Sequence, residues 1–296
     1  MDESLDEAAS VFAGLRPRLF GIAYQMLGGV AEAEDVVQET WVKWQTADRA
    51  GVRDPAAFLV TMTTRLAINV IQSARRRREK YVGPWIPEPL DTGGGPEAGA
   101  ERAAEVELAL LMLLERLSPP ERAAYVLRES FDYPYADIAA ILQVSEANAR
   151  QLASRARRRV AAERRTPVSR TAHRRLLETF LTAARTGDLG ALEELLAADA
   201  VSYTDGGGAV RGASRIPVAG RDRVAKFVVA FAPRFWPGAT VTWVEANGRP
   251  AVLVSRDGAA FALLSISASG DGVDRLLWLL NPAKLGGFQR NAPAGS

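Results

Sequence analysis

The spacing of apolar residues changes once along this chain, and that change restricts the possible folds more than any other feature. Up to about residue 165, apolar side chains recur at intervals of three and four, as they do from Phe12 to Leu27, which is the period of amphipathic helices. Beyond residue 200 they alternate or form short runs between Gly, Asn-Gly and Asp-Gly turns, a pattern typical of strands. The sequence therefore predicts helical domains followed by an α+β domain, which begins with helices at 173–185 and 189–197.

Proline and glycine mark where the domains separate. Residues 85–90 read Trp-Ile-Pro-Glu-Pro-Leu and residues 93–96 read Gly-Gly-Gly-Pro, which predicts a linker that is first stiff and then flexible. A shorter break follows at Thr166-Pro167, and a chain of 296 residues has room for two or three domains. We therefore expect all-α helical domains at 1–81 and 105–165, a linker at 82–104 and an α+β domain at 172–290.

Composition excludes several classes of protein. Hydrophobic residues make up 48% of the chain and charged residues 24%, which is ordinary for a soluble globular protein. Cysteine is absent, which excludes disulfides, thiolate metal sites and a cysteine nucleophile. The chain begins with acidic residues, and its longest apolar run, at 108–114, is too short to span a bilayer. We therefore expect a cytoplasmic protein with no metal, no cofactor and no membrane attachment.

Residues 135–152 have the spacing of a helix-turn-helix motif. Ile138 and Leu152 would pack the two helices together, and Ser145 would cap the second helix. Gln143 occupies the turn position that glycine often fills, where a left-handed conformation costs roughly 1 kcal/mol. The second helix would present side chains able to read the major groove or contact phosphates: Arg150, Gln151, Ser154, Arg155 and Arg157. The alternative is a helical hairpin with a solvated basic face.

Two helices of the first domain carry further candidate residues. The helix predicted at 31–44 would expose an acidic face with Asp35, Gln38 and Glu39. The helix after Pro55 carries Asn69 and ends in four arginines at 75–78, which could hold one nucleic-acid strand while polar groups contact an unpaired base. Each feature also fits a simpler alternative: a solvated acidic face, and a helix end where cations interact favourably with the helix dipole.

Several ordered blocks resemble a known family. Residues 18–24 (RLFGIAY), 33–41 (AEDVVQETW) and 73–79 (SARRRRE) resemble region 2 of extracytoplasmic-function sigma factors, and residues 117–122 (LSPPER) with the helix-turn-helix resemble region 4. Residues 85–90, 205–208 (DGGG) and 281–285 (NPAKL) resemble the subgroup in which a SnoaL-like domain, a cone-shaped α+β barrel, follows region 4. The chain has Ala209 where the subgroup has Lys, and Ala283 where it has Asp, and both departures affect the expected strength of the contacts made there.

The resemblance implies a transcription initiation factor that carries RNA polymerase core to promoter DNA, monomeric when free and without enzymatic activity. The face with Asp35, Gln38 and Glu39 would dock on the polymerase. The minus-ten element would be melted and held by Asn69, Arg75, Arg76 and Arg77. The minus-thirty-five duplex would be read by the helix with Arg150, Gln151, Ser154, Arg155 and Arg157.

The resemblance also suggests a regulatory contact within the chain. We expect the linker, through Trp85, Pro87, Glu88 and Pro89, to meet the loop Asp205, Gly206, Gly207 and Gly208 and the segment with Asn281, Pro282, Lys284 and Leu285. Such a contact would let the C-terminal domain modulate the sigma regions in cis. The alternative is a spacer and an unrelated surface turn.

Two other functions remain open. A SnoaL-type enzyme fused to a DNA-binding unit would need an acid or base in its cavity, but the sole histidine, His173, is predicted to be exposed at a helix start. Asp205 precedes three glycines, which indicates a tight turn more than a buried acid. Aromatic residues at Trp236, Trp243, Phe261 and Trp278 could line a cavity for an unidentified small ligand or form ordinary core. A ligand-sensing regulator that binds duplex DNA without polymerase is the third possibility.

Overall fold

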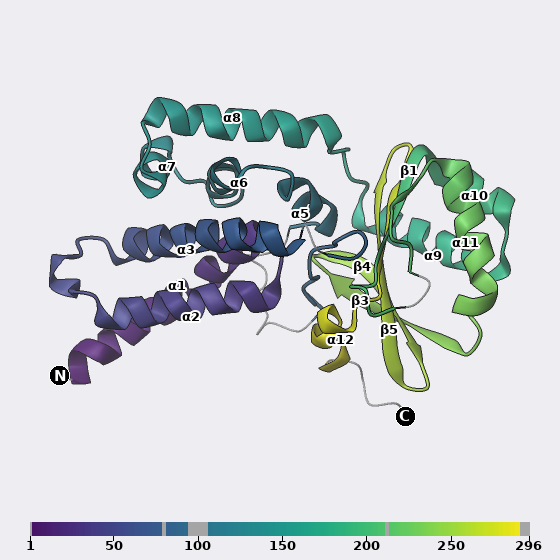
Figure 1. Cartoon of the computed structure of the whole chain (residues 1–296), viewed down its shortest axis with the longest axis horizontal. Coiled ribbons are helices and arrows are strands. Elements are labelled where there is room, and N and C mark those ends of the chain that lie inside the picture. The colour runs from purple at the N-terminus through teal and green to yellow at the C-terminus, as the bar shows by residue number, and fades with distance from the viewer. Residues whose placement is uncertain (1, 79–80, 94–105, 211–212, 291–296) are drawn as a thin grey trace. The chain divides into compact units, whose positions relative to one another are not determined.

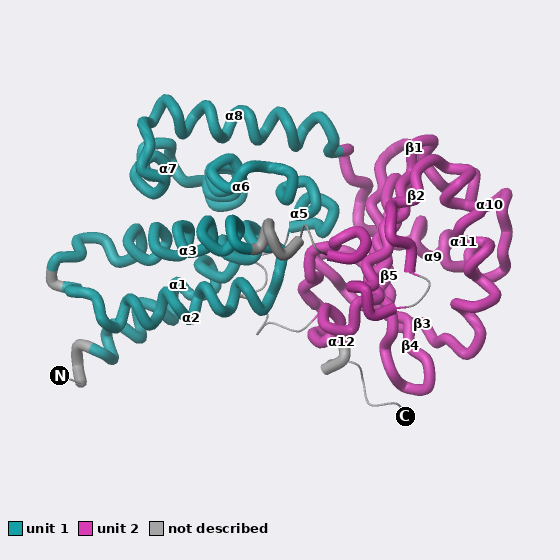
Figure 2. The backbone as a smooth tube through the Cα atoms, in the orientation of Figure 1, with its two compact units in different colours: residues 1–79, 95–164 teal, residues 80–94, 165–296 magenta. Residues whose placement is uncertain are grey.

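The computed structural model describes residues 2–78, 81–93, 106–210 and 213–290, and the chain folds into two compact units (Figure 2). The first unit consists of residues 1–79 and 95–164, and the second of residues 80–94 and 165–296. The chain therefore leaves the first unit after its third helix, contributes a short segment to the second unit and then returns. Each unit is described by itself below.

In the described part of the first unit, every regular element is a helix (Figure 1). Its elements are α1 (Asp2–Leu27), α2 (Val30–Thr46), η1 (Arg49–Gly51), α3 (Pro55–Arg78), α5 (Leu108–Leu114), α6 (Pro119–Tyr125), η3 (Val126–Ser130), α7 (Tyr135–Leu142) and α8 (Glu146–Glu163). Helices α1, α2 and α3 pack on one another, and α8 packs on α6 and α7. The three-and-four spacing is confirmed, since Leu19, Ile22 and Met26 of α1 are fully buried.

Arginines join the two halves of this unit. Arg122 in α6 is 2% exposed, forms an ion pair with Glu115 at 2.8 Å and donates to the carbonyl of Met26 at 2.6 Å. Burial lowers the pKa of Arg122 to about 10. Arg65 of α3 donates from Nε to the carbonyl of Ile141 at 2.9 Å, near the end of α7. Guanidinium groups are favourable at such carbonyls because the last C=O groups of a helix lack partners within the helix.

The second unit is an α+β domain, as predicted. Its elements are α9 (Arg170–Thr186), α10 (Leu189–Leu195), β1 (Leu196–Asp205), β2 (Val218–Ala219), α11 (Arg221–Phe235), β3 (Ala239–Ala246), β4 (Arg249–Arg256), β5 (Ala259–Ser269), β6 (Gly272–Leu279), η4 (Pro282–Lys284) and α12 (Gly286–Arg290). The strand order is β2-β1-β6-β5-β4-β3, with β1 and β6 parallel and the other neighbours antiparallel. The sheet does not close into a complete barrel, since β2 and β3 form its edges, and the α+β fold class is as the resemblance implied.

Two tight turns give the sheet its hairpins. Asn247-Gly248 joins β3 to β4 and Asp257-Gly258 joins β4 to β5, and all four residues have positive φ, between 51° and 78°. Such a pair of left-handed residues twists in the same sense as the strands it connects. Both turns were predicted from the sequence, whereas helix α11 was missed, although Val224, Val228 and Ala232 recur at intervals of four on its buried side.

The core of the second unit lies between the sheet and helices α9, α10 and α11 (Figure 1). It contains Phe180 of α9, Val224 of α11 and Leu276 of β6, all fully buried. His173 is only 3% exposed, so the prediction of an exposed histidine is wrong. Ser169 caps α9 three residues earlier than predicted, which places His173 one turn before the buried Leu177 on the inward side of the helix.

Candidate functional site

The helix-turn-helix is formed by α7 and α8. Ile138 and Ala149 are fully buried between the helices, and the Ser145 hydroxyl accepts a hydrogen bond from the backbone N–H of Asn148 at 3.2 Å. Gln143 adopts the left-handed conformation, with φ of 57° and ψ of 46°. The turn geometry predicted from the sequence is therefore present, and it fixes the direction of α8.

The outer face of α8 brings together most of the predicted reading residues. Arg150, Gln151, Ser154 and Arg155 are exposed and line one shallow depression with Arg158. Sequence reasoning missed Arg158, although it lies four residues after Ser154 and eight after Arg150, on the same helical face. Arg157 does not share this face, because it forms an ion pair with Glu129 at 2.6 Å.

Acidic residues of the same unit hold these arginines. Glu121 of α6 is 5% exposed and accepts hydrogen bonds from Arg155 at 3.2 Å and from Arg159 at 2.9 Å. Burial opposes the charged form of Glu121, but the hydrogen bonds from Ser118 and Arg155 outweigh it and lower its pKa. Arg150 pairs with Glu146 and lies 4.8 Å from the ring centre of Tyr135. The basic face is thus oriented before any ligand arrives.

Helix α2 exposes the predicted acidic face. Asp35, Gln38 and Glu39 are exposed, and Glu39 pairs with Lys43 at 3.5 Å. Val42, which sequence reasoning missed, is 56% exposed and lies one turn after Gln38 on this face. A single exposed apolar side chain is common on protein surfaces, so Val42 by itself does not identify a docking surface.

The end of α3 carries the other candidates. Asn69 is exposed on this helix, together with Gln72 and Ser73. The side chains of Arg75, Arg76 and Arg77 lie outside the described residues. The helical backbone nevertheless continues through Arg78.

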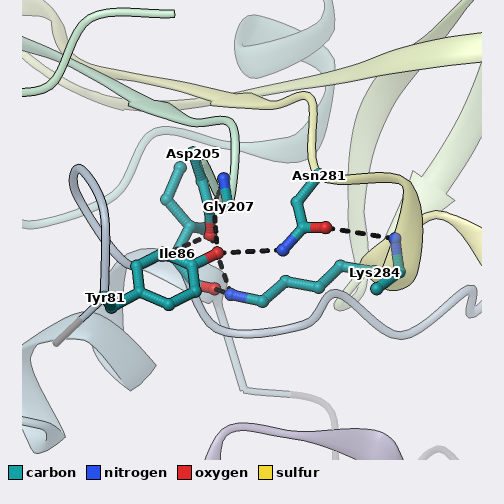
Figure 3. Close-up of polar contacts among 7 residues, drawn as sticks. Tyr81, Ile86, Asp205, Gly207, Asn281 and Lys284 are labelled. Carbon is teal, nitrogen blue, oxygen red and sulfur yellow. Dashed lines mark hydrogen bonds and ion pairs between the residues drawn. The ribbon is translucent and has the colours of Figure 1, made fainter. Parts of the chain in front are cut away.

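The second unit contains a buried polar cluster centred on Asp205, which we call the Asp205 cluster: Tyr81, Ile86, Asp205, Asn281 and Lys284 (Figure 3). Asp205 is fully buried and accepts hydrogen bonds from the Tyr81 hydroxyl at 2.5 Å, the Ile86 N–H at 3.0 Å and the Lys284 ammonium at 2.8 Å. The Gly207 N–H also donates to it, at 3.1 Å. The prediction that Asp205 is not a buried acid is wrong, because β1 extends to Asp205 and the segment after Tyr81 covers its side chain.

Lys284 and Asn281 complete the Asp205 cluster. The Lys284 ammonium donates to the Ile86 carbonyl at 2.5 Å and lies 4.3 Å from the ring centre of Trp85. Asn281 donates from Nδ2 to the Tyr81 hydroxyl at 2.9 Å. Burial and the hydrogen bond to Asp205 raise the pKa of Tyr81 above its usual range, so the phenol keeps its proton. Tyr81 was missed in the sequence because it lies at the end of the predicted first domain.

Two glycines after Asp205 make room for these contacts. Gly207 has a φ of 59°, and a Cβ atom there would lie 2.5 Å from Nδ2 of Asn281. Gly208 has a φ of 75°, and its Cβ would lie 3.3 Å from Cβ of Val82. Any larger residue at position 207 would therefore be strained and would displace Asn281.

A second attachment point lies at the turn between β3 and β4. Leu90 and Asn247 exchange two hydrogen bonds, from the Leu90 N–H to Oδ1 at 3.1 Å and from the Asn247 N–H to the Leu90 carbonyl at 2.9 Å. The hydroxyl of Thr92 accepts from the Gly248 N–H at 2.9 Å. The segment 81–92 is thus fixed to the second unit at both ends.

The remaining predicted contact residues differ in burial. Gly206, Pro87, Pro89 and Leu285 are buried. Trp85 and Glu88 are half-buried, and Pro282 is exposed.

Within the described ranges, no group of histidine and carboxylate side chains has a geometry that could hold a metal ion. In that same part of the chain, no helix has the length and hydropathy needed to cross a membrane.

Comparison with known proteins identifies the class. Residues 11–77 match the family model for sigma-70 region 2, and residues 107–160 match the model for sigma-70, region 4. These two regions define a sigma factor of RNA polymerase. The two matches lie in the first unit, on α1 to α3 and on α5 to α8 respectively.

Similar proteins identify the family. The chain is 39% identical over 237 residues to the ECF RNA polymerase sigma factor SigJ of Mycobacterium tuberculosis, covering 77% of this chain and 74% of that protein. It is 32% identical over 288 residues to the probable ECF RNA polymerase sigma factor SigI of the same species, covering 95% of both chains. The crystal structure of M. tuberculosis SigJ superposes with a TM-score of 0.75 at 32% identity, covering 94% of this chain and 98% of that one. The chain belongs to the extracytoplasmic-function sigma factors.

Replacing Asp205 tests whether this carboxylate holds the segment 81–92 in place. Asp205→Asn removes the charge that faces Lys284, and a broken buried pair costs about 3–5 kcal/mol, so we expect the second unit to unfold at lower urea concentration. The backbone amides of Ile86 and Leu90 should also exchange hydrogen faster. Asp271→Asn is the matched control, because Asp271 pairs with Arg165 at 3.5 Å on the surface. Equal urea midpoints and exchange rates in the two variants would show that Asp205 does not hold the segment.

Proposed function

We propose that this sigma factor, which directs RNA polymerase to promoters, reads the minus-thirty-five element with the outer face of α8. The observation that carries the proposal is the single exposed face formed by Arg150, Gln151, Ser154, Arg155 and Arg158 in the stretch that matches region 4. Arginine and glutamine make bidentate contacts with base edges in the major groove, and serine can bond to bases or phosphates. Arg157, on another side of the helix, would contribute a phosphate contact at most.

The first three helices would perform the other two tasks of a sigma factor. The exposed face of α2, with Asp35, Gln38, Glu39 and Val42, would bind RNA polymerase core. Asn69 and the arginines at 75–77 of α3 would hold the melted minus-ten element. An exposed amide beside a run of cations suits an unpaired base next to its phosphates.

The second unit would regulate the chain in cis. The segment 81–92 lies between α3 and α5 in the sequence, and so between the two sigma regions. While it is held by Asp205 and by Asn247, fewer free residues connect regions 2 and 4. Because the reach of a flexible chain grows with the number of free residues, release of this segment would let the regions move further apart.

No catalytic step is part of this proposal. Four donors already occupy the carboxylate of Asp205, so it is not placed to act as a general base. We place the protein in the cytoplasm, where polymerase and promoter DNA meet, and we expect a monomer when it is free.

Replacing Arg155 by Ala tests the reading helix. We expect affinity of the polymerase holoenzyme for a promoter selected by the full-length chain to fall by about 1–3 kcal/mol, the value of one bidentate base contact. Arg157→Ala is the matched control, since it removes the same charge from another side of α8. An equal loss in both variants, measured by electrophoretic mobility shift at one salt concentration, would contradict the assignment of this face.

Charge reversal at Asp35 tests the polymerase surface. Asp35→Lys should weaken binding to core polymerase without lowering the melting temperature, because the side chain is exposed. The control is Glu7→Lys, at an exposed acidic position of α1. The binding constants can be compared by titrating core polymerase with fluorescently labelled sigma factor. Identical values for the two variants would contradict the proposal that α2 binds core polymerase.

Reconstituted transcription with core polymerase tests the regulation. A chain ending before Asn281 lacks Lys284 and Leu285, so we expect the segment 81–92 to be released and transcription to rise. A chain ending at Arg165 lacks the whole second unit, and we expect lower activity because contacts needed for polymerase engagement are also removed. Trp85→Ala should act in the same direction as the shorter truncation. Transcription at the full-length level in all three would mean that the second unit is not an internal regulator.

A further inference from the structure

The helix-covered face of the second unit contains a cavity of about 270 Å³ that is not part of the Asp205 cluster. Its walls come from α11, from the strands β1, β4, β5 and β6, and from the segment near Ala213. Thr204 and Trp278, which are neighbours across β1 and β6, form part of the sheet wall. Protein interiors are closely packed, so an unfilled space of this size indicates a binding site more than an ordinary core.

Aromatic rings form much of the cavity wall. Phe235 makes edge-to-face contacts with Trp236, Phe261 and Trp278, with ring centres 4.8, 5.2 and 5.2 Å apart. On α11, Phe231 lines the cavity and is 37% exposed, which marks a side open to solvent. Rings arranged in this way offer faces and edges against which another planar ring can pack.

The charged side chains that line the cavity are basic. Arg234 and Arg256 are among its lining residues, and in the described part of the chain no acidic side chain lines it. Arg256 lies 4.8 Å from the ring centre of Phe261 and donates from Nη2 to the carbonyl of Phe235 at 2.8 Å. This hydrogen bond and the ring hold the guanidinium at the cavity wall. A carboxylate is the ligand group that matches a fixed guanidinium best.

Two buried donors of this wall lack acceptors. The Nε of Arg256 and the indole N–H of Trp278 make no hydrogen bond with any described residue. Buried donors are normally paired, since leaving one unpaired is destabilising. Trp278 is 7% exposed, so solvent does not satisfy its indole either. Both nitrogen atoms are themselves enclosed, so a bound molecule would meet them only after these side chains moved.

We propose that this cavity binds a small planar aromatic acid, whose rings pack against Phe235, Trp236 and Phe261 and whose carboxylate meets Arg256. The cavity volume of about 270 Å³ suits a molecule with one ring or two fused rings, because an apolar cavity of about 150 Å³ accepts a benzene molecule. The proposal adds a ligand to the protein and does not depend on which residues contact promoter DNA or polymerase.

Calorimetric titration of the full-length chain with naphthoate tests the proposal, with naphthylmethanol as the neutral molecule of the same ring size. We expect one naphthoate per chain, bound at least about tenfold more tightly than naphthylmethanol. Arg256→Gln should lower naphthoate affinity by about tenfold or more and leave naphthylmethanol binding unchanged. The matched control is Arg223→Gln, an exposed position on α11 outside the cavity, which should bind both molecules like the parent chain.

A second variant tests the place of binding. Ala232→Phe adds a ring inside the cavity and should abolish binding of both molecules, with circular dichroism melting as the check of folding. If that variant does not fold, the comparison of Arg256→Gln with Arg223→Gln decides whether the acid binds in this cavity. The proposal is overturned if naphthoate shows no saturable binding up to about 10 mM. Equal affinity for the acid and the alcohol, or equal effects of the two arginine substitutions, would also overturn it.

Discussion

The arrangement of the second unit depends on one buried carboxylate. A charged group in a protein interior is tolerated only when hydrogen bonds and an opposite charge surround it. Asp205 meets this requirement by gathering a phenol, two backbone N–H groups and the Lys284 ammonium. Two of these partners, Tyr81 and Ile86, come from the segment 81–92 and one from η4, so the requirement of a single side chain fixes two distant segments on the same sheet.

Arginine has the corresponding role in the first unit. Arg122 is as deeply buried as the core residues around it, and its charge is compensated by Glu115 and by a helix-end carbonyl. Arg65 uses the same chemistry at the end of α7, which is the first helix of the helix-turn-helix. Because a buried charge that loses its partner is strongly destabilising, these contacts hold the helices of the first unit in one arrangement.

The sequence predicted what local rules determine. Ser145 as a helix cap, Gln143 in a left-handed turn and the Asn247-Gly248 hairpin each depend on a few neighbouring residues, and all three are present. Tyr81 could not be assigned in this way, because its partner Asp205 lies 124 positions away and nothing near Tyr81 indicates a buried acid. His173 and helix α11 were misjudged although local signals exist for both: Ser169 caps α9, and Val224, Val228 and Ala232 recur at helical spacing in α11.

The pairing of β1 with β6 brings the cavity and the Asp205 cluster within one residue of each other. In the parallel register Thr204 is opposite Trp278 and Asp205 is opposite Leu279. Successive side chains of a strand point to opposite faces, so Thr204 lines the cavity while Asp205 holds the segment from Tyr81. Leu280 also lines the cavity, and the N–H groups of Leu280 and Asn281 both donate to the Asp205 carbonyl, at 2.8 and 2.9 Å. A molecule that shifted the cavity wall would therefore move the same backbone that positions the Asp205 cluster, since interiors this closely packed transmit small displacements.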